Sequence, residues 1–298
     1  MTEAERITRA LNGHWYGRYG VAFCPAHRNT RTPALSIREA EDGRFLAHCH
    51  AGCAFLAILG ALRGSGMVEG SGNYTPPSTT NLAKIRATEE TKAVKREGQA
   101  LGLWRKALPI NGTIAETYLR SRGIVCQLPD VLRFHPECWH GPSAKRLPAM
   151  VARVEGCKRV AVHRTYLRSD GTGKAAVEPA KAMLGAVAGG AVRLTDAPGP
   201  LVVAEGIETA LSLASGLLRY PATIWAALST SGIRGMRLPS RPGRLTIAPD
   251  GDEPGRIAAH ALAERAQALG WQVSLLPIPD GRDWNDILKM EGELHDRS

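Results

Sequence analysis

The 298-residue chain has few aromatic residues and no long apolar segment, and we expect no leader for export. Phe, Trp and Tyr make up 5% of the sequence, so we expect no extensive aromatic stacking surface. No apolar run approaches the roughly 20 residues of a membrane-spanning helix, and we expect no membrane partner. The first residues, MTEAERITRALNG, are amphipathic and include acids, which excludes a signal peptide and predicts a cytoplasmic location.

What the chain does contain is typical of a folded protein. Hydrophobic residues make up 44% and charged residues 22% of the sequence, and its length leaves room for two or three small modules. The six cysteines are irregularly spaced, and no export signal accompanies them. This combination favours a reducing compartment, and metal binding over disulfide bonds.

Positive charge is concentrated in the middle of the chain, whose formal net charge is +10. Lys145–Arg193 holds ten Lys and Arg against three Asp and Glu, whereas Leu201–Ser298 holds ten against twelve. A basic segment next to an acidic one predicts a polyanionic substrate, held by the first and processed by the second. The alternative is a solvated basic surface without a partner.

Acidic residues follow two apolar runs in the last hundred residues. Leu201–Ala204 leads directly to Glu205, and Leu245–Ala248 leads to Asp250 and Asp252. A helical pattern follows each run, and this alternation predicts an α/β fold with a parallel sheet. Ligands of such sheets bind beyond the carboxyl ends of the strands, where these acids are expected to lie.

Carboxylates that gather at one edge of a sheet repel one another unless a cation lies between them. Oxygen ligands of this kind suit Mg²⁺ or Mn²⁺, and Mg²⁺ keeps waters that substrate phosphates can replace. With a third acidic group near the C-terminus, we predict a metal site formed by Glu205, Asp250, Asp252, Asp283 and Asp286. The alternative for each acid alone is a solvated loop residue or, for Asp252, a helix N-cap.

Near the N-terminus, two pairs of metal-ligand residues flank strand-like segments. Cys24 and His27 are separated by two residues, and Cys49 and Cys53 by three. Three thiolates and one imidazole form a closed set for structural Zn²⁺, and a module this small depends on the metal to fold. His50 has the tighter spacing to Cys53 and is the alternative to Cys49 as third ligand. Reduced cysteines without metal are the second alternative.

The predicted elements divide the chain into four parts. A segment rich in Gly, Ser, Thr and Pro follows the N-terminal ribbon and is typical of a flexible linker. Helical patterns and strand-like runs fill the middle, and alternating strands and helices fill the remainder. The predicted parts are a zinc ribbon at 1–63, a linker at 64–80, a helical and basic α+β subdomain at 81–195, and an α/β domain at 196–298.

These motifs resemble those of a known enzyme family. Glu205-Gly206 followed by Asp250-Gly251-Asp252 resembles the Toprim domain, and Asp283–Asp286 resembles the third acidic region of phage and mobile-element primases. The Cys-Pro-x-His pair ahead of a second cysteine pair resembles the CHC-type zinc ribbon of bacterial-type primases. In that family two residues more commonly separate the second pair, whereas three separate Cys49 from Cys53 here. The chain therefore resembles a DnaG-like primase of phage or mobile-element type.

The resemblance implies a fold and an activity. The implied fold class is α/β, with a Toprim Rossmann-like parallel sheet, a basic α+β subdomain and an N-terminal zinc ribbon. The implied activity is Mg²⁺-dependent nucleotidyl transfer, which makes short RNA primers on single-stranded DNA from ribonucleoside triphosphates. The implied roles are catalysis for Glu205, Asp250 and Asp252, and contact with nucleic-acid or nucleotide phosphates for Arg164, Lys174 and Lys181.

Two other activities share these motifs: a Toprim-type nuclease or topoisomerase-like enzyme, and a non-catalytic zinc-ribbon accessory that binds DNA. The chain has no recognisable tyrosine-bearing strand-passage module, and its intact acidic motifs argue against the accessory. The Gly-rich stretch after Lys181 lacks the Gly-Lys-Ser/Thr ending of a Walker A motif. A replicative helicase is therefore expected only as a separate partner.

Overall fold

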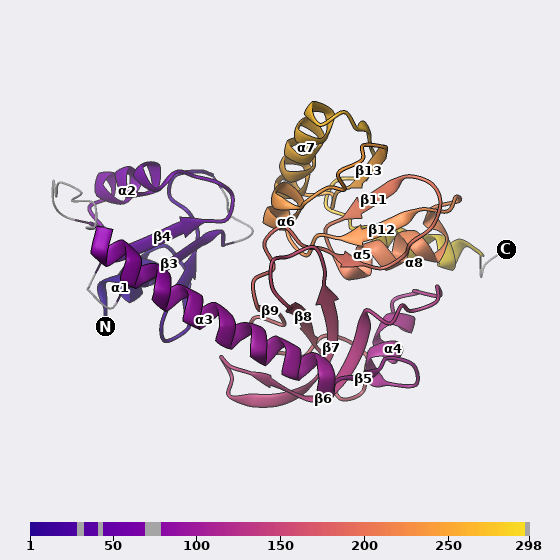
Figure 1. Ribbon diagram of the computed structural model, residues 1–298, viewed down its shortest axis with the longest axis horizontal. Coiled ribbons are helices and arrows are strands. Elements are labelled where there is room, and N and C mark those ends of the chain that lie inside the picture. Colours follow the sequence, from indigo (N-terminus) through magenta and orange to yellow (C-terminus); the bar gives the residue numbers. More distant parts are fainter. Residues whose placement is uncertain (29–32, 41–43, 69–78, 296–298) are drawn as a thin grey trace. The chain divides into compact units, whose positions relative to one another are not determined.

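The protein forms two units, Met1–Ser78 and Thr79–Ser298. Figure 1 shows the helices and strands of each. The computed structural model describes four stretches of the chain: 1–28, 33–40, 44–68 and 79–295. Most of the linker predicted at 64–80 lies outside these described residues.

The first unit is a small antiparallel sheet with two helices, and the strand order is β1-β2-β3-β4. The side chain of Thr2 caps the first helix by accepting a hydrogen bond from the backbone N–H of Glu5. Leu35 and Ile37 are buried and Ser36 between them is not, which is the period of a half-buried strand. The elements are α1 (Glu3–Ala10), β1 (His14–Trp15), β2 (Gly20–Ala22), β3 (Leu35–Glu39), β4 (Phe45–Cys49) and α2 (Phe55–Gly64).

The second unit begins with a long helix and an antiparallel sheet, here called the middle sheet, with strand order β5-β6-β7-β8-β9. Val162 of β8 packs with Ala100 of α3. Arg164 is two positions further along the strand, so it lies on the same face of the middle sheet, the face that α3 covers. His163 and Thr165 lie on the opposite face. The elements are α3 (Thr79–Lys106), β5 (Leu108–Pro109), α4 (Ile114–Arg120), β6 (Leu132–His140), β7 (Lys145–Val154), β8 (Ala161–Tyr166) and β9 (Lys181–Leu184).

The remainder of the second unit is a sheet with strand order β10-β12-β11-β13-β14. The edge strand β10 runs antiparallel to β12, and the other neighbours are parallel. The elements are β10 (Val192–Arg193), β11 (Leu201–Ala204), α5 (Ile207–Ser212), a π-helical turn η1 (Leu213–Leu217), β12 (Thr223–Ala226), α6 (Thr230–Gly235), β13 (Arg244–Ala248), α7 (Glu253–Ala268), β14 (Gln272–Leu275) and α8 (Trp284–His295).

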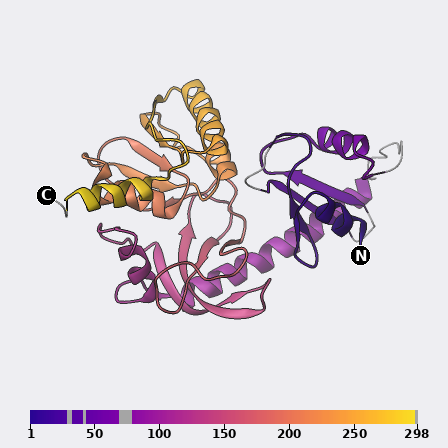
Figure 2. The same ribbon diagram turned by 180° about the vertical axis from the view of Figure 1, so that it is seen from behind.

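Helices cover both faces of this parallel sheet. Val203 of β11 packs in one cluster with Ala258 and Leu262 of α7, whereas Val202 packs in another with Ile207 of α5. Figures 1 and 2 show α6 and α7 on one side of the strands and α5 and α8 on the other. A strand buried on both faces must be apolar throughout, which explains the unbroken run Leu201–Ala204.

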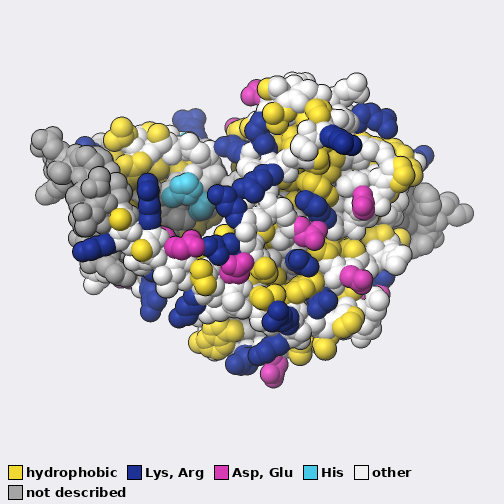
Figure 3. Space-filling view, in the orientation of Figure 1, with side chains coloured by type: hydrophobic (Ala, Val, Ile, Leu, Met, Phe, Trp, Pro, Cys, Tyr) yellow, Lys and Arg dark blue, Asp and Glu magenta, His cyan; other side chains and the backbone are white. Residues whose placement is uncertain are grey.

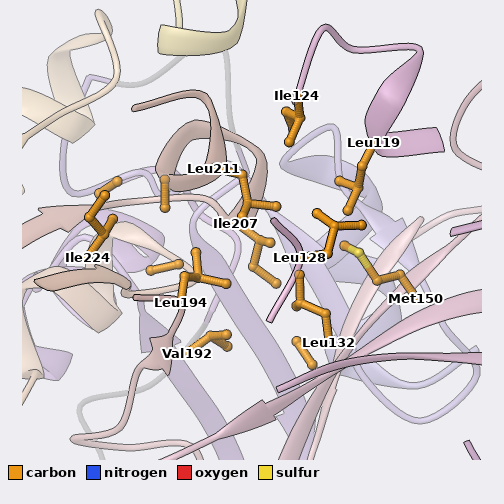
Figure 4. Close-up of a cluster of buried hydrophobic side chains, with 14 of the residues drawn as sticks. Leu119, Ile124, Leu128, Leu132, Met150, Val192, Leu194, Ile207, Leu211 and Ile224 are labelled. Carbon is orange, nitrogen blue, oxygen red and sulfur yellow. The ribbon is translucent and has the colours of Figure 1, made fainter. Parts of the chain in front are cut away.

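The middle sheet and the parallel sheet share one core. Leu132 and Met150 of the middle sheet lie in the same buried cluster as Leu119 of α4 and Ile207 and Leu211 of α5 (Figure 4). Each fully buried side chain of this size stabilises the fold by about 2 kcal/mol relative to an exposed one. The shared core therefore fixes α5, and the residues that follow β11, against the middle sheet.

The α/β fold class predicted from the sequence is confirmed, with a parallel sheet, an antiparallel middle sheet and a small N-terminal sheet. The antiparallel edge strand β10 and the short strands β5 and β9 were not predicted. Helix α8 was not predicted either, since Asp283 and Asp286 were interpreted only as an acidic group. In the described stretches, no helix has both the length and the apolar character needed to cross a membrane.

Candidate active site and zinc centre

Two neighbouring parallel strands lead to acidic residues at the same edge of the sheet. β11 and β13 pair with Ala204 opposite Ala248. Glu205 follows β11 directly, and Asp250 comes two residues after the end of β13. Thr209 of α5 donates a hydrogen bond of 3.2 Å from Oγ1 to Oδ1 of Asp250. The helix after one strand therefore contacts the carboxylate after the other.

Neighbouring charges shift the ionisation of the two strand-end acids, Glu205 and Asp250. The pKa of Glu205 is raised to about 8 by burial and then by the negative charges of Asp250 and Asp252. Burial, followed by the charge of Asp283, raises the pKa of Asp250 to about 6. The charge of Lys181 acts in the opposite direction on both groups. The charges that act on these two strand-end acids come from three carboxylates, those of Asp250, Asp252 and Asp283, and from the ammonium group of Lys181.

Three of the predicted metal ligands also cap helices. Oδ1 of Asp252 accepts a hydrogen bond of 2.8 Å from the N–H of Gly255 at the start of α7. At the start of α8, the N–H of Asp286 donates to Oδ1 of Asp283 at 2.8 Å, and the N–H of Asp283 donates to Oδ2 of Asp286 at 3.1 Å. For Asp252 the helix-cap interpretation thus holds together with proximity to the strand-end acids. Asp286 is not among the charges that shift either strand-end acid.

Gly251, between the two acids of the Asp-Gly-Asp motif, permits a close approach of the loop that carries Asp283. Its N–H donates to the carbonyl of Arg282 at 2.8 Å, and its own carbonyl accepts from Gly281 at 2.8 Å. A Cβ at this position would lie 2.7 Å from the carbonyl oxygen of Arg282 and would overlap that of Pro279. The absence of a side chain therefore lets the third acidic region reach the second.

The chemistry of these side chains fits a hard divalent cation. Carboxylate oxygens are the donors that Mg²⁺ prefers, and a cation offsets the repulsion that raises the pKa of the strand-end acids. The carboxylates are nevertheless more widely spaced than the ligands of the first unit. Among the described residues, only the Cys and His side chains of that unit form a group of three or more that is close enough to share an ion.

A buried carboxylate that the sequence analysis missed binds the two lysines of the predicted phosphate site. Oε2 of Glu208 on α5 lies 2.9 Å from Nζ of Lys181, and Oε1 lies 3.9 Å from Nζ of Lys174. The hydroxyl of Tyr118 on α4 donates to Oε1 at 2.9 Å. Burial opposes ionisation of Glu208, but the two lysine charges hold its pKa well below the usual value. The structure thus brings Lys174 and Lys181 together beside the acidic edge.

His163 lies on the same face of the middle sheet as Lys181, whose strand neighbour is Thr165. Burial, followed by the charge of Lys181, lowers the pKa of His163 to about 4. Nδ1 of His163 and Oγ1 of Thr165 are buried and make no hydrogen bond to the described residues. A neutral imidazole therefore borders the lysines.

Arg164 lies on the other face of the middle sheet, away from Lys181. Its guanidinium donates to the carbonyls of Trp139 and Met183, each at 3.3 Å, and lies 5.6 Å from the centre of the Tyr166 ring. The structure does not bring Arg164 to the acidic edge. These contacts favour a structural role for this side chain over the predicted contact with phosphate.

The first unit brings the four predicted zinc ligands together. The ligand atoms of Cys24, His27, Cys49 and Cys53 all lie within 4.8 Å of one another. Nδ1 of His27 is 3.1 Å from Sγ of Cys53 and 3.8 Å from Sγ of Cys49. Burial raises the pKa of Cys24 to about 12, with a contribution from the neighbouring thiols, and a bound cation would reverse this effect. The Cys₃His cluster is consistent with Zn²⁺.

His50, the alternative third ligand, points elsewhere. Its Nε2 lies 2.7 Å from Oγ of Ser36, and its ring packs edge-on against His48 at 4.9 Å between centroids. His50 is not part of the four-residue group, whereas Cys49 is. The geometry therefore favours Cys49 as a ligand over His50.

The first unit also carries a cluster of aromatic rings between β1 and β2. The rings of His14 and Tyr16 are 4.6 Å apart, and Tyr16 stacks on Tyr19 at 5.2 Å. Gly17 makes the turn with a φ of 77°, and Arg18 is exposed beside it. The rings of this small cluster lie within six positions of the sequence.

Comparison with known proteins bears on both parts of the second unit. Residues 94–194 match a family described as a domain of unknown function, DUF7146. Residues 200–293 match the family described as Toprim domain. The C-terminal part of this chain is a Toprim domain. Its acidic edge contains Glu205 and the Asp250–Asp252 motif, and the chain resembles DnaG-like primases in combining a Toprim domain with a zinc-binding type of Cys/His cluster.

Solved structures similar to this chain include three primases. The zinc-binding and RNA polymerase domains of the Aquifex aeolicus primase match 100% of this chain and 82% of that one, at 16% identity and a TM-score of 0.40. The RNA polymerase domain of Mycobacterium tuberculosis primase DnaG matches 70% of this chain and 82% of that one, at 16% identity and a TM-score of 0.40. The primase fragment of the bacteriophage T7 primase-helicase matches 50% of this chain and 63% of that one, at 17% identity and a TM-score of 0.30. No curated protein matched the chain.

Proposed function

We propose that this chain is a DNA primase that joins ribonucleotides on a single-stranded DNA template. The observation that carries the proposal is the meeting of Glu205, Asp250 and two lysines at one edge of the Toprim sheet. Carboxylates that can hold divalent cations, next to ammonium groups that can bind phosphates, are the parts that nucleotidyl transfer requires. The zinc-type cluster of the first unit supports an activity on nucleic acid.

Glu205, Asp250 and Asp252 would hold Mg²⁺, and Asp283 would lie beside them. When bound, Mg²⁺ supplies positive charge that lowers the pKa of the attacking 3′-hydroxyl and neutralises the phosphate oxygens. Thr209 orients Asp250 through the hydrogen bond to Oδ1. In the reaction, the 3′-oxygen forms a bond to the α-phosphorus of the incoming nucleotide, and pyrophosphate leaves.

Lys174 and Lys181 would bind the triphosphate. Their side chains are 37% and 36% exposed, so both ammonium groups can reach a ligand. His163, held neutral by burial, adds no repulsion toward these cations. The chain therefore has a cationic surface for phosphate directly beside its carboxylates.

The template would be held by backbone phosphates and by base stacking. Lys and Arg side chains recur over the face of the second unit seen in Figure 3, interspersed with Asp and Glu. Tyr19 of the first unit is 39% exposed and stacks on Tyr16, which makes a surface for a base. We propose a separate replicative helicase as the partner that exposes the template.

Incubation with single-stranded DNA, four ribonucleoside triphosphates and Mg²⁺ tests the proposal. We expect oligoribonucleotides whose synthesis Asp250→Asn reduces by at least about a hundredfold, since one ligand of a shared cation loses its charge. The matched control is Asp130→Asn at an exposed position, which should keep wild-type activity.

The same reaction distinguishes the other two activities. Cleavage of the DNA without RNA synthesis, abolished by Asp250→Asn, would identify a Toprim-type nuclease. Binding of DNA with neither product would identify a non-catalytic accessory. Either result overturns the primase proposal.

A further inference from the structure

Glu208 joins three elements of the second unit through one buried carboxylate. Its side chain is 6% exposed, whereas those of Lys174 and Lys181 are 37% and 36% exposed. Tyr118 on α4 binds one carboxylate oxygen, and Lys181 on β9 binds the other. The carboxylate therefore has little access to solvent, while the cations that it binds remain accessible.

The carboxylate lies next to the first acidic motif. Oε2 of Glu208 is 3.7 Å from the place that a Cβ on Gly206 would occupy. Since this same oxygen binds Nζ of Lys181 at 2.9 Å, the ammonium group is held beside the residue that follows Glu205. Hydrogen bonding from one side leaves the other donors of Nζ available.

Two lysines share this one carboxylate. Two ammonium groups lie within 4.0 Å of Glu208, and one carboxylate neutralises only one of them. Arg122 lies close by, over the ring of Tyr118 at 5.8 Å. The two accessible ammonium groups suit an anionic ligand that comes to the acidic edge.

We propose that Glu208 is a positioning residue that fixes Lys181 for contact with the triphosphate of the incoming nucleotide. The inference rests on the proposed function and adds a residue to it. Glu208 does not touch the substrate; it acts through Lys181. A contribution to stability alone would make no difference to nucleotide affinity once the fold is intact, and this separates the two roles.

The test is nucleotide affinity, measured without turnover. A fluorescent ATP analogue is titrated into the full chain in Ca²⁺, for wild type, Glu208→Gln and Lys181→Gln. Glutamine keeps the size of the side chain and an acceptor for Tyr118 but removes the charge. We expect each variant to weaken binding about tenfold, which is the loss of one charged contact. Glu264→Gln, an exposed glutamate on α7, is the matched control and should bind like wild type.

The double variant Glu208→Gln/Lys181→Gln separates positioning from folding. Because the two residues act as a unit, we expect its affinity to equal that of either single variant. Its denaturant midpoint should lie above that of Glu208→Gln, since the ammonium group left without its carboxylate partner is gone. The inference is overturned if Glu208→Gln binds the nucleotide as tightly as wild type. It is also overturned if the double variant regains both the nucleotide affinity and the stability that Glu208→Gln has lost.

The outcomes for the inference and for the proposed function are distinct. If wild type makes no RNA but binds the ATP analogue, and Glu208→Gln weakens that binding, the primase proposal fails and the role of Glu208 stands. If wild type makes RNA and Glu208→Gln leaves the KM for nucleotides unchanged, the primase proposal stands and the role of Glu208 fails.

Discussion

The backbone N–H of Gly251 donates a hydrogen bond of 2.8 Å to the carbonyl of Arg282. This bond joins the Asp-Gly-Asp motif to the loop before α8, and it brings Asp283 within electrostatic reach of Asp250. The backbone of Gly251 therefore helps to hold the second and third acidic regions together.

Gly251→Ala is expected to lower both stability and activity. The added Cβ would overlap the carbonyl oxygen of Pro279, and overpacking of this kind costs about 1–3 kcal/mol. Gly98→Ala is the control, because a Cβ at Gly98 in α3 meets nothing within 4 Å and alanine favours the helix by about 0.5–1 kcal/mol. Denaturant unfolding and RNA synthesis measure both variants. Equal stability of Gly251→Ala and wild type would contradict the prediction.

The contribution of His163 to the stability of the second unit is expected to fall as pH drops from 6.5 to 4, whereas the raised pKa values of Glu205 and Asp250 act in the opposite direction. The folded state lowers the pKa of His163 from 6.5 to about 4, through burial and the charges of Lys181, Arg164 and Lys174, with Glu208 opposing. The unfolded chain therefore binds more protons in this window, so protonation favours unfolding by up to about 3 kcal/mol. Above pH 6.5 this contribution is fully present.

The measurement is the urea midpoint at pH 7 and pH 4.5 for wild type and His163→Gln. Glutamine does not titrate, whereas the acids of the site titrate in both proteins, so the difference in midpoint between pH 7 and pH 4.5 should shift in favour of the variant. Parallel losses in both proteins would show that His163 does not control this dependence.

Cys49→Ser is expected to remove zinc, and His50→Ala to leave it bound. Cys49 lies in the four-residue group, whereas Nε2 of His50 lies 2.7 Å from Oγ of Ser36. Metal analysis of the full chain, purified without chelator, gives the zinc content of both variants. Loss of zinc in His50→Ala with retention in Cys49→Ser would reverse the assignment.

Tyr19→Ala is expected to weaken binding of single-stranded DNA about five- to thirtyfold, because one stacked base contributes roughly 1–2 kcal/mol. Tyr220→Ala is the matched control, since Tyr220 is similarly exposed, at 45% against 39% for Tyr19, but belongs to the Toprim domain. Fluorescence anisotropy of labelled DNA measures both variants. Equal affinities would exclude the aromatic cluster as a stacking surface.

Residues whose signals are local were predictable. The run Leu201–Ala204 has to be apolar because helices cover both faces of its strand, and Asp252 precedes a helix that it caps. Cys24 and His27 form a pair that metal geometry explains without knowledge of the fold. The parallel sheet and the zinc-type cluster follow from such patterns.

Residues whose partners are distant in the sequence were not predictable. Glu208 reads as an ordinary helix residue, and its partner Tyr118 lies 90 positions away. The predicted contact of Arg164 with phosphate depends on which face of its strand meets the Toprim domain. The packing of Val162 on α3 decides that face, and no pattern within β8 alone distinguishes the two.

The buried cluster that contains Leu132, Met150, Ile207 and Leu211 makes the boundary near residue 195 a boundary of sequence families only. A fragment that ends there would expose apolar surface on each half, and we expect each half to aggregate. Insertions, deletions and exchanges between relatives at this point would fail unless both halves changed together. We therefore expect residues 94–293 to evolve together as one folding unit.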